Sequence, residues 1–455
     1  MLYYDVTDLV LHSVTSTKVT GIQRVILEGL RGLQGRATPF FLSPVTGQWY
    51  ILNGLDVSDA TDLSVFRHLW HRADLHDAAP PETFLCYARD YLAKGGRQRF
   101  AAKMYAAGQR LPFATLVNRF VAKTVRRRLA PALPGVEIKP LPKLQSDDVI
   151  VLFGTPWHFQ SQYEEFARQR PAGLETVVLI YDLIPLVSPY VPDSLREKFR
   201  RYIPFALKTA TKVVVNSDNT ADDVRAFARS EGMSEPEIVK VQLAHKLPPL
   251  PERAPDKSLR VRKLLSEKFA LCVGSIESRK NHLNLLVTWA KFFHSSEYQG
   301  EKLVLAGRWL WDVEAVQTIL HGTGFVYGSV IMIDHPSDEE LDDLYRACRF
   351  TAYPSHYEGW GLPVGESLSY GKPCLHFDNS SLVEAGYGMS DAVPYQDLGA
   401  YYAGFIRLMG DEDYYQNRLH LIRAQQHRLR SWHDFSLDVE RVLLGERASI
   451  VSAVG

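Results

Sequence analysis

Short apolar runs alternate with longer helical patterns along the whole chain. A short apolar run bounded by turn residues is typical of a buried strand, and a longer stretch with apolar residues at helical spacing is typical of an amphipathic helix. This alternation predicts an α/β fold in which helices cover parallel sheets. Strands are predicted at residues 2–6, 149–153, 176–181 and 212–216, and again at residues 269–274, 303–307, 330–333, 350–353 and 374–377.

A proline-rich segment, residues 247–255, separates these two sets of strands. Repeated prolines interrupt both helices and central strands, so the segment is predicted to be a linker. A chain of 455 residues also exceeds the usual size of a single core. We therefore expect an N-terminal domain at residues 1–247, a C-terminal domain at residues 248–430 and a final helix within residues 431–455.

Composition narrows the class of protein only a little. The chain is 46% hydrophobic and 23% charged with a formal net charge of zero, as in an ordinary folded protein, and nothing points to nucleic acid as a partner. No run of about 18 apolar residues predicts a spanning helix, and residues 2–6 resemble a first strand more than a signal peptide. Cys272 and Cys374 lie inside apolar runs, which favours buried thiols over disulfides. We expect a cytoplasmic protein.

The most informative segment is residues 357–366, Tyr-Glu-Gly-Trp-Gly-Leu-Pro-Val-Gly-Glu. It follows the predicted strand at residues 350–353, and in parallel α/β sheets ligands bind at the carboxyl ends of strands. Glu358 can accept hydrogen bonds from sugar hydroxyls, and Glu366, near the start of the next helix, can bind a ribose. The alternative is a surface turn with two solvated carboxylates.

This segment, with the residues from Tyr353 onward and Ser380 to Glu384, resembles the donor site of the retaining glycosyltransferases of family 4. The resemblance is strong over about residues 265–400 and weaker in the first half. It implies a GT-B fold, in which two Rossmann-like domains face a central cleft. The N-terminal domain would then bind the acceptor, the C-terminal domain would bind the nucleotide sugar, and the last helix would pack back on the N-terminal domain. A last helix that simply finishes the second domain is the alternative.

The same resemblance assigns roles to residues of this segment. It implies that Glu358 contacts the donor sugar and that Glu366 contacts the ribose of the nucleotide. The turn between them is implied to bind the donor through Gly359, Gly361 and Leu362.

A basic pair lies in the loop after the strand at residues 269–274. Arg279 and Lys280 are predicted to sit near a helix N-terminus, where a diphosphate would gain charge-assisted hydrogen bonds, each contributing about 1.5–3 kcal/mol. The resemblance implies that both residues bind the donor diphosphate and stabilise its departure, with Gly274 beside them. An exposed basic pair on a loop is the alternative.

Two positions in the first half are candidates for the facing side of the site. Gly21, at the start of a predicted helix, matches a glycine-containing loop that faces the donor in the family. Asp182 follows the strand at residues 176–181 and either orients an acceptor hydroxyl or caps a loop. Many relatives have histidine before this aspartate, whereas this chain has Tyr181, so no histidine role is transferred. No metal and no cofactor are predicted.

The region from Tyr91 to Val136 contains no Asp or Glu, while residues 94–128 are rich in Lys and Arg interleaved with aromatic residues. Such a segment suits docking on an anionic bilayer, on the inner face of the cell membrane, and a lipid-linked acceptor. A solvated pair of basic helices is the alternative.

The expected activity is transfer of a hexose from a nucleotide sugar to a hydroxyl of a growing cell-surface glycan such as lipopolysaccharide, with retention of configuration. Mannose from GDP-mannose is favoured because residues 20–25 resemble bacterial polysaccharide enzymes. The alternatives are a sugar-nucleotide epimerase or phosphorylase on the same fold and a catalytically silent scaffold subunit. The sequence leaves the base, the sugar, the linkage and the oligomeric state open.

Overall fold

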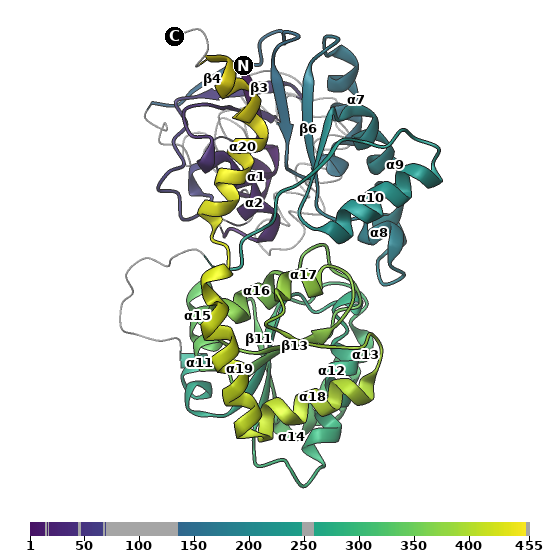
Figure 1. The fold of residues 1–455 in the computed structure, drawn as a ribbon, viewed down its shortest axis with the longest axis vertical. Helices are drawn as coiled ribbons and strands as arrows, with labels where there is room; N and C mark the ends of the chain where they lie inside the picture. Colours follow the sequence, from purple (N-terminus) through teal and green to yellow (C-terminus); the bar gives the residue numbers. More distant parts are fainter. Residues whose placement is uncertain are drawn as a thin grey trace, which may run out of the picture.

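Two sheets, one in each half of the molecule, form the frame of the protein (Figure 1). The computed structural model describes residues 1–13, 16, 18–43, 47–66, 69, 135–247 and 259–451. The basic segment at residues 94–128, and the linker apart from Leu247, lie outside the described residues. No helix in the described part of the chain is both long enough and apolar enough to cross a bilayer.

The first sheet has eight strands among the described residues, in the order β4-β3-β2-β1-β5-β6-β7-β8. These are β1 (Leu2–Asp5), β2 (Thr38–Leu42), β3 (Trp49–Asn53), β4 (Glu137–Pro140), β5 (Val149–Leu152), β6 (Glu175–Ile180), β7 (Lys212–Val215) and β8 (Ile238–Lys240). The six strands β2-β1-β5-β6-β7-β8 pair in parallel with their neighbours. Strand β3 pairs antiparallel with both β2 and β4. The strands predicted in this half are parallel as expected, whereas the antiparallel edge formed by β3 and β4 was not predicted. The short connection from β2 to β3 permits a hairpin but not a crossover.

The second sheet has six strands in the order β11-β10-β9-β12-β13-β14, all of them parallel. These are β9 (Phe269–Val273), β10 (Lys302–Gly307), β11 (Val330–Asp334), β12 (Phe350–Tyr353), β13 (Cys374–Phe377) and β14 (Asp391–Val393). Alternate residues of β9 point to opposite faces, so Ala270 and Cys272 pack in one buried cluster while Phe269 and Leu271 pack in another. Both faces of this sheet are thus buried, which explains why its strands are continuous apolar runs.

Helices cover the faces of both sheets (Figure 1). In the first half they are α1 (Thr7–Ser13), α2 (Gly21–Gly32), α7 (Gln160–Gln169), α8 (Ile184–Val187), α9 (Asp193–Thr209) and α10 (Asp218–Ser230). In the second half they are α11 (Leu259–Arg262), α12 (His282–Phe293), α13 (Glu314–Gly322), α14 (Gly324–Gly328), α15 (Asp338–Ala347), α16 (Leu362–Ser369), α17 (Leu382–Gly386), α18 (Leu398–Gly410) and α19 (Glu412–Gln425).

The last helix, α20 (Trp432–Val451), returns to the first half and lies against α2 (Figure 1). The Ser436 hydroxyl donates a hydrogen bond of 2.8 Å to the carbonyl oxygen of Glu28. A Cβ atom on Gly32 would lie 2.7 Å from the Cβ of Ser436, so the two helices approach at a glycine. The chain therefore passes between the halves again near residue 430. There the backbone N–H of His245 donates to the carbonyl of Arg430 at 2.9 Å, joining the two passages.

Candidate active site

The candidate site lies where the second sheet reverses its strand order. Strands β10 and β11 follow β9 on one side, while β13 and β14 follow β12 on the other, so the β9–β12 pair is a topological switch point. Ligands of open α/β sheets bind outside the carboxyl ends of strands at such a point. The loop after β9 carries Arg279 and Lys280, and the loop after β12 carries Glu358. Residues that are distant in the sequence thus meet because their strands are adjacent and parallel.

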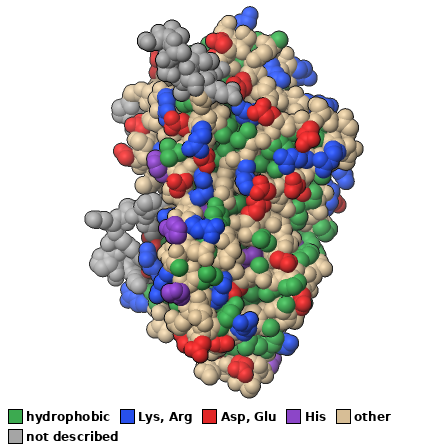
Figure 2. All heavy atoms as spheres, in the orientation of Figure 1, with side chains coloured by type: hydrophobic (Ala, Val, Ile, Leu, Met, Phe, Trp, Pro, Cys, Tyr) green, Lys and Arg blue, Asp and Glu red, His purple; other side chains and the backbone are tan. Residues whose placement is uncertain are grey.

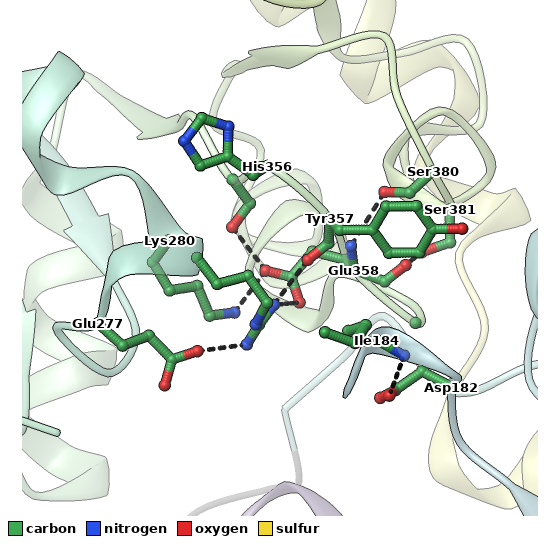
Figure 3. Close-up of polar contacts among 12 residues, drawn as sticks. Asp182, Ile184, Glu277, Lys280, His356, Tyr357, Glu358, Ser380 and Ser381 are labelled. Atoms are coloured by element: carbon green, nitrogen blue, oxygen red, sulfur yellow. Dashed lines mark hydrogen bonds and ion pairs between the residues drawn. The ribbon is translucent and has the colours of Figure 1, made fainter. Parts of the chain in front are cut away.

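The Glu358 carboxylate is at the centre of this cluster (Figure 3). Its Oε2 pairs with Arg279 Nη1 at 2.8 Å, and its Oε1 accepts from Lys280 Nζ at 2.6 Å. The same Oε1 accepts from the hydroxyls of Ser355 at 2.6 Å and Tyr353 at 3.0 Å. The Glu358 side chain is buried, so these four donors replace the water that a carboxylate would otherwise bind. The interpretation of a solvated surface turn is wrong for Glu358.

Arg279 joins Glu358 to a second buried carboxylate. Its Nη2 donates to Glu277 Oε1 at 2.6 Å, and its Nη1 also donates to the carbonyl of Tyr357 at 2.7 Å. Both cations are largely buried and paired, so the interpretation of an exposed basic pair is wrong as well. The cluster contains two cations and two carboxylates.

Burial and pairing shift the pKa values of these groups in opposite directions. Burial alone would raise the pKa of Glu358, but the charges of Arg279 and Lys280 outweigh it and bring that pKa down to about 2. Burial would lower the pKa of Arg279, yet Glu358 and Glu277 raise it overall. For Lys280, burial dominates and the pKa is lowered despite the attraction of Glu358. Glu358 is therefore an ionised carboxylate at neutral pH.

Asp182 lies on the opposite side of the junction, in the loop after β6. A Cβ atom on Gly359 would lie 2.5 Å from the Tyr181 carbonyl oxygen and 2.8 Å from the Asp182 Cβ, so only glycine allows the halves to meet here. Asp182 Oδ1 accepts from the backbone N–H of Ile184 at 3.0 Å. Burial raises the pKa of Asp182 to about 6, although Arg279 counteracts it. The structure thus brings Asp182 beside the Glu358 loop.

Glu366 lies on α16, away from the Glu358 carboxylate, and has its own surroundings. Its Oε2 accepts from the Tyr345 hydroxyl at 2.7 Å, and burial raises its pKa, an effect that Tyr345 and Arg24 partly offset. Arg24 comes from α2 in the first half, and its Nη2 lies 3.9 Å from Asp338 Oδ2. Glu366 therefore lies at the boundary between the two halves, beside Tyr345 of the second half and near Arg24 of the first. It is not a solvated carboxylate on a surface turn.

Glycines shape the remaining predicted positions. Gly361 has a φ of +100° and caps α16, a conformation that favours glycine, and Leu362 begins that helix. A Cβ on Gly21 would be 3.7 Å from the side chain of Leu362, so α2 begins opposite α16. Gly274 packs directly on Gly307 of the neighbouring strand β10. Gly21 and Leu362 thus approach each other across the junction, whereas the neighbours of Gly274 and Gly361 belong to the second half.

Sequence analysis assigned no role to several residues that belong to the cluster. Ser355 lies within the segment that resembles the donor site, and Glu277 lies two residues before Arg279. A carboxylate next to a basic pair gives no signal that it is buried. Tyr353 begins the segment that resembles the donor site but has no predicted role of its own, and its hydroxyl accepts from Lys280 and donates to Glu358. A tyrosine at the last position of a strand that ends at a ligand edge was the available signal. Tyr181 donates to the Phe153 carbonyl at 2.6 Å.

A second set of contacts holds the halves together around the cluster. The Glu384 carboxylate of α17 accepts from the backbone N–H groups of Asp218 and Asn219 at 2.8 and 2.9 Å, at the N-terminus of α10. The Tyr357 hydroxyl donates to Asp223 Oδ2 at 2.7 Å. Glu384 lies in the quoted family segment, but its partner in the other half could not be deduced from spacing. In the described part of the chain, no three His, Cys, Asp or Glu side chains gather so as to hold a metal ion.

Similarity to solved structures decides the fold. HepE from Anabaena, solved in complex with UDP and glucose, aligns over 98% of this chain and 99% of its own, with a TM-score of 0.57 at 12% identity. The chain has the GT-B fold. Sucrose-phosphate synthase from Thermosynechococcus elongatus aligns over 66% of this chain and 74% of the synthase, with a TM-score of 0.51 at 16% identity. The predicted fold class is confirmed.

Sequence comparisons relate this chain to a glycosyl transferase family model and to two bacterial mannosyltransferases. Residues 256–385 match the family model of glycosyl transferases group 1, a range that contains the whole cluster. O-antigen chain mannosyltransferase B of Escherichia coli is 30% identical over 251 residues, 54% of this chain and 64% of that protein. The serotype-specific mannosyltransferase WbdA of E. coli is 23% identical over 239 residues, 50% of this chain and 29% of that protein. The GT-B chain thus spans less than two thirds of the length of either relative.

Proposed function

We propose that this protein is a glycosyltransferase that moves a hexose from a nucleotide sugar to a hydroxyl of a growing cell-surface glycan. The observation that carries the proposal is the buried cluster of Arg279, Lys280 and Glu358 at the switch point of the second sheet. The match to glycosyl transferases group 1 over residues 256–385 supports it. The mannosyltransferase relatives support mannose as the sugar, while GDP-mannose as the donor stays a prediction.

In this proposal Arg279 and Lys280 bind the diphosphate of the donor. Glu277 and the Tyr357 carbonyl hold Arg279 in place, and the Tyr353 hydroxyl holds Lys280, so both cations are positioned before the leaving group departs. The bond between the anomeric carbon and the diphosphate oxygen breaks, and a bond to the acceptor oxygen forms on the same face. The acceptor proton moves to the leaving diphosphate. Retention by this route needs no nucleophile from the protein.

The two carboxylates nearest the junction take different roles. Glu358 has a pKa of about 2, which makes it a weak base, so it positions the sugar. Asp182 has a pKa of about 6 and lies on the facing half, where it orients the acceptor hydroxyl. Glu366 would contact the ribose. Gly21, Gly274, Gly359, Gly361 and Leu362 would shape the backbone around the donor.

Docking on an anionic membrane through residues 94–128 stays a prediction. On the face of the molecule in Figure 2, basic and acidic side chains of the described residues are interspersed over both halves. This face therefore supplies no broad basic area of its own. Co-sedimentation of the full chain with anionic and with neutral vesicles tests the prediction, which requires binding to anionic vesicles only.

Nucleotide binding followed by sugar transfer tests the proposed function. Calorimetry with GDP, UDP, dTDP and ADP would identify the base, with GDP expected. Lys280→Ala should lose about 1.5–3 kcal/mol of binding free energy. Lys291→Ala is the matched control, because Lys291 lies on α12 over the ring of Tyr402 at 4.0 Å, outside the cluster.

The product then separates the alternatives. With the matching nucleotide sugar and a glycan acceptor, NMR of the product should show the anomeric configuration of the donor. A changed nucleotide sugar formed without acceptor would instead identify an epimerase. Failure to bind any of the four nucleotides would favour the silent scaffold subunit.

A further inference from the structure

The cations expected to bind the diphosphate are already occupied by a carboxylate of the protein. Lys280 Nζ contacts Glu358 Oε1 at 2.6 Å, and Arg279 Nη1 contacts Glu358 Oε2 at 2.8 Å. The guanidinium of Arg279 also contacts Glu277 at 2.6 Å and donates to the Tyr357 carbonyl at 2.7 Å. With two cations and two carboxylates, the cluster has no net positive charge to offer an anion.

A diphosphate therefore needs the same N–H groups that Glu358 uses. A buried carboxylate that loses its cations without replacement is strongly destabilised. Glu358 can yield these donors at low cost only when a ligand brings new ones. The hydroxyls of a sugar are such donors, whereas a nucleoside diphosphate without a sugar has none to place there.

We propose that Glu358 is an internal competitor of the diphosphate, which makes the site prefer the complete nucleotide sugar to the nucleoside diphosphate product. This inference rests on the proposed function. When the sugar is present, Glu358 turns to its hydroxyls and releases Arg279 and Lys280. After transfer the hydroxyls leave with the product glycan, so Glu358 returns to the two cations and displaces the nucleoside diphosphate.

Two hydroxyls mark the position to which Glu358 returns. Ser355 and Tyr353 both donate to its Oε1, at 2.6 and 3.0 Å. The Tyr353 hydroxyl also accepts from Lys280, so Tyr353 contacts both Glu358 and the cation with which Glu358 pairs. The resting position is thus defined by neutral donors as well as by charge.

Calorimetry with free GDP, and in parallel UDP, dTDP and ADP, on wild type and on Glu358→Gln tests the proposal. The variant keeps the size of the side chain but removes the competing charge. It should bind the preferred nucleoside diphosphate about tenfold more tightly than wild type, which corresponds to about 1.4 kcal/mol. Its preference for the nucleotide sugar over the nucleoside diphosphate should fall by a similar factor.

Glu277→Gln is the matched control. Glu277 is equally buried and contacts Arg279 at the same distance as Glu358 contacts Lys280, but Lys280 is not its partner in the cluster. The proposal requires that this variant tighten binding of the nucleoside diphosphate less than Glu358→Gln does, because Glu277 occupies only one of the two cations. Equal tightening in both variants would mean that net charge alone decides, and would overturn the proposal.

The remaining outcomes separate this inference from the proposed function. If wild type transfers sugar and Glu358→Gln does not tighten binding, the competition is wrong and the transferase stands. If neither protein binds any of the four nucleotides, both are wrong. Should Glu358→Gln fail to fold, Ser355→Ala replaces it, because loss of one resting hydrogen bond should still tighten binding about twofold. Unchanged or weaker binding in Ser355→Ala would then overturn the proposal.

Discussion

The two sides of the junction are built differently. On the side of the second sheet, the loops after β9 and β12 carry Arg279, Lys280 and Glu358 in a buried network in which each charge has opposite charges within 2.8 Å. On the side of the first sheet, Asp182 is held by a backbone N–H, and Gly21 has only an apolar neighbour. Paired charges thus lie on the side of the second sheet, and the side of the first sheet contributes the Asp182 carboxylate and a glycine contact.

Removing Arg279, the cation shared by Glu277 and Glu358, should have the largest effect on the charged side of the junction. Arg279→Ala leaves Glu277 and Glu358 buried with too little positive charge, so we expect a loss of about 3–5 kcal/mol in the free energy of unfolding. Chemical denaturation measures it. Arg168→Ala removes an exposed ion pair with Glu165 and should change little. Equal stability of the two variants would mean that the buried network is not structural.

Adding one carbon atom at the contact between the sides should have the next largest effect. Gly359→Ala would push its Cβ against the Tyr181 carbonyl and Asp182, costing about 1–3 kcal/mol or forcing the halves apart. Thermal unfolding and small-angle scattering would distinguish these results. Gly410→Ala, where no heavy atom lies within 4 Å of the added carbon, is the control and should not open the molecule.

The pH dependence of stability tests the side of the first sheet, where Asp182 lies. The pKa of Asp182 is raised to about 6 by burial, so ionised Asp182 destabilises the folded state above pH 6. A pKa raised from about 4 to about 6 corresponds to about 3 kcal/mol in the free energy of unfolding. The partial exposure of Asp182 reduces the expected effect to on the order of 1–2 kcal/mol. Asp182→Asn should therefore be more stable than wild type at pH 7.5, with the gain disappearing as the pH falls from 6 to below 4. A constant difference across that range would exclude this explanation.

The contact between Glu384 and α10 should give the smallest effect. Glu384→Ala removes the acceptor for two backbone N–H groups at the start of α10, and we expect a loss of about 1 kcal/mol. Asp397→Ala removes a cap of α18 within one half. Hydrogen exchange should show faster exchange in α10 for the first variant only, if Glu384 joins the halves.

Much of the second half could be predicted from the sequence because its strands are buried on both faces. The apolar runs at β9, β12 and β13 stand out, and predicted and observed bounds agree within a residue. Strands β4 and β8 lie at sheet edges and carry charged residues, so no apolar run marks them. The antiparallel pair of β3 and β4 could not be predicted because the partners are far apart in the sequence.

The residues of the cluster were predicted, but their arrangement was not. Sequence analysis expected Arg279 and Lys280 to face a ligand and Glu358 to face a sugar, in separate roles. The ion pairs among them depend on the adjacency of β9 and β12, which is a property of strand order. The donor and acceptor roles of these residues stay predictions.

The joined passages near His245 and Arg430 determine how the molecule can move. The carbonyl of Arg430 accepts from the backbone N–H of His245, and the backbone N–H of Arg430 donates to His245 Nδ1 at 3.2 Å, so two hydrogen bonds join these residues. Because the two passages between the halves are joined at these residues, rotation about them would separate the halves more readily than sliding would. Any opening would move Ser278 and Tyr190 apart, because their contact bridges the halves elsewhere along the junction. Opening of the junction would then be a rotation about residues 245 and 430.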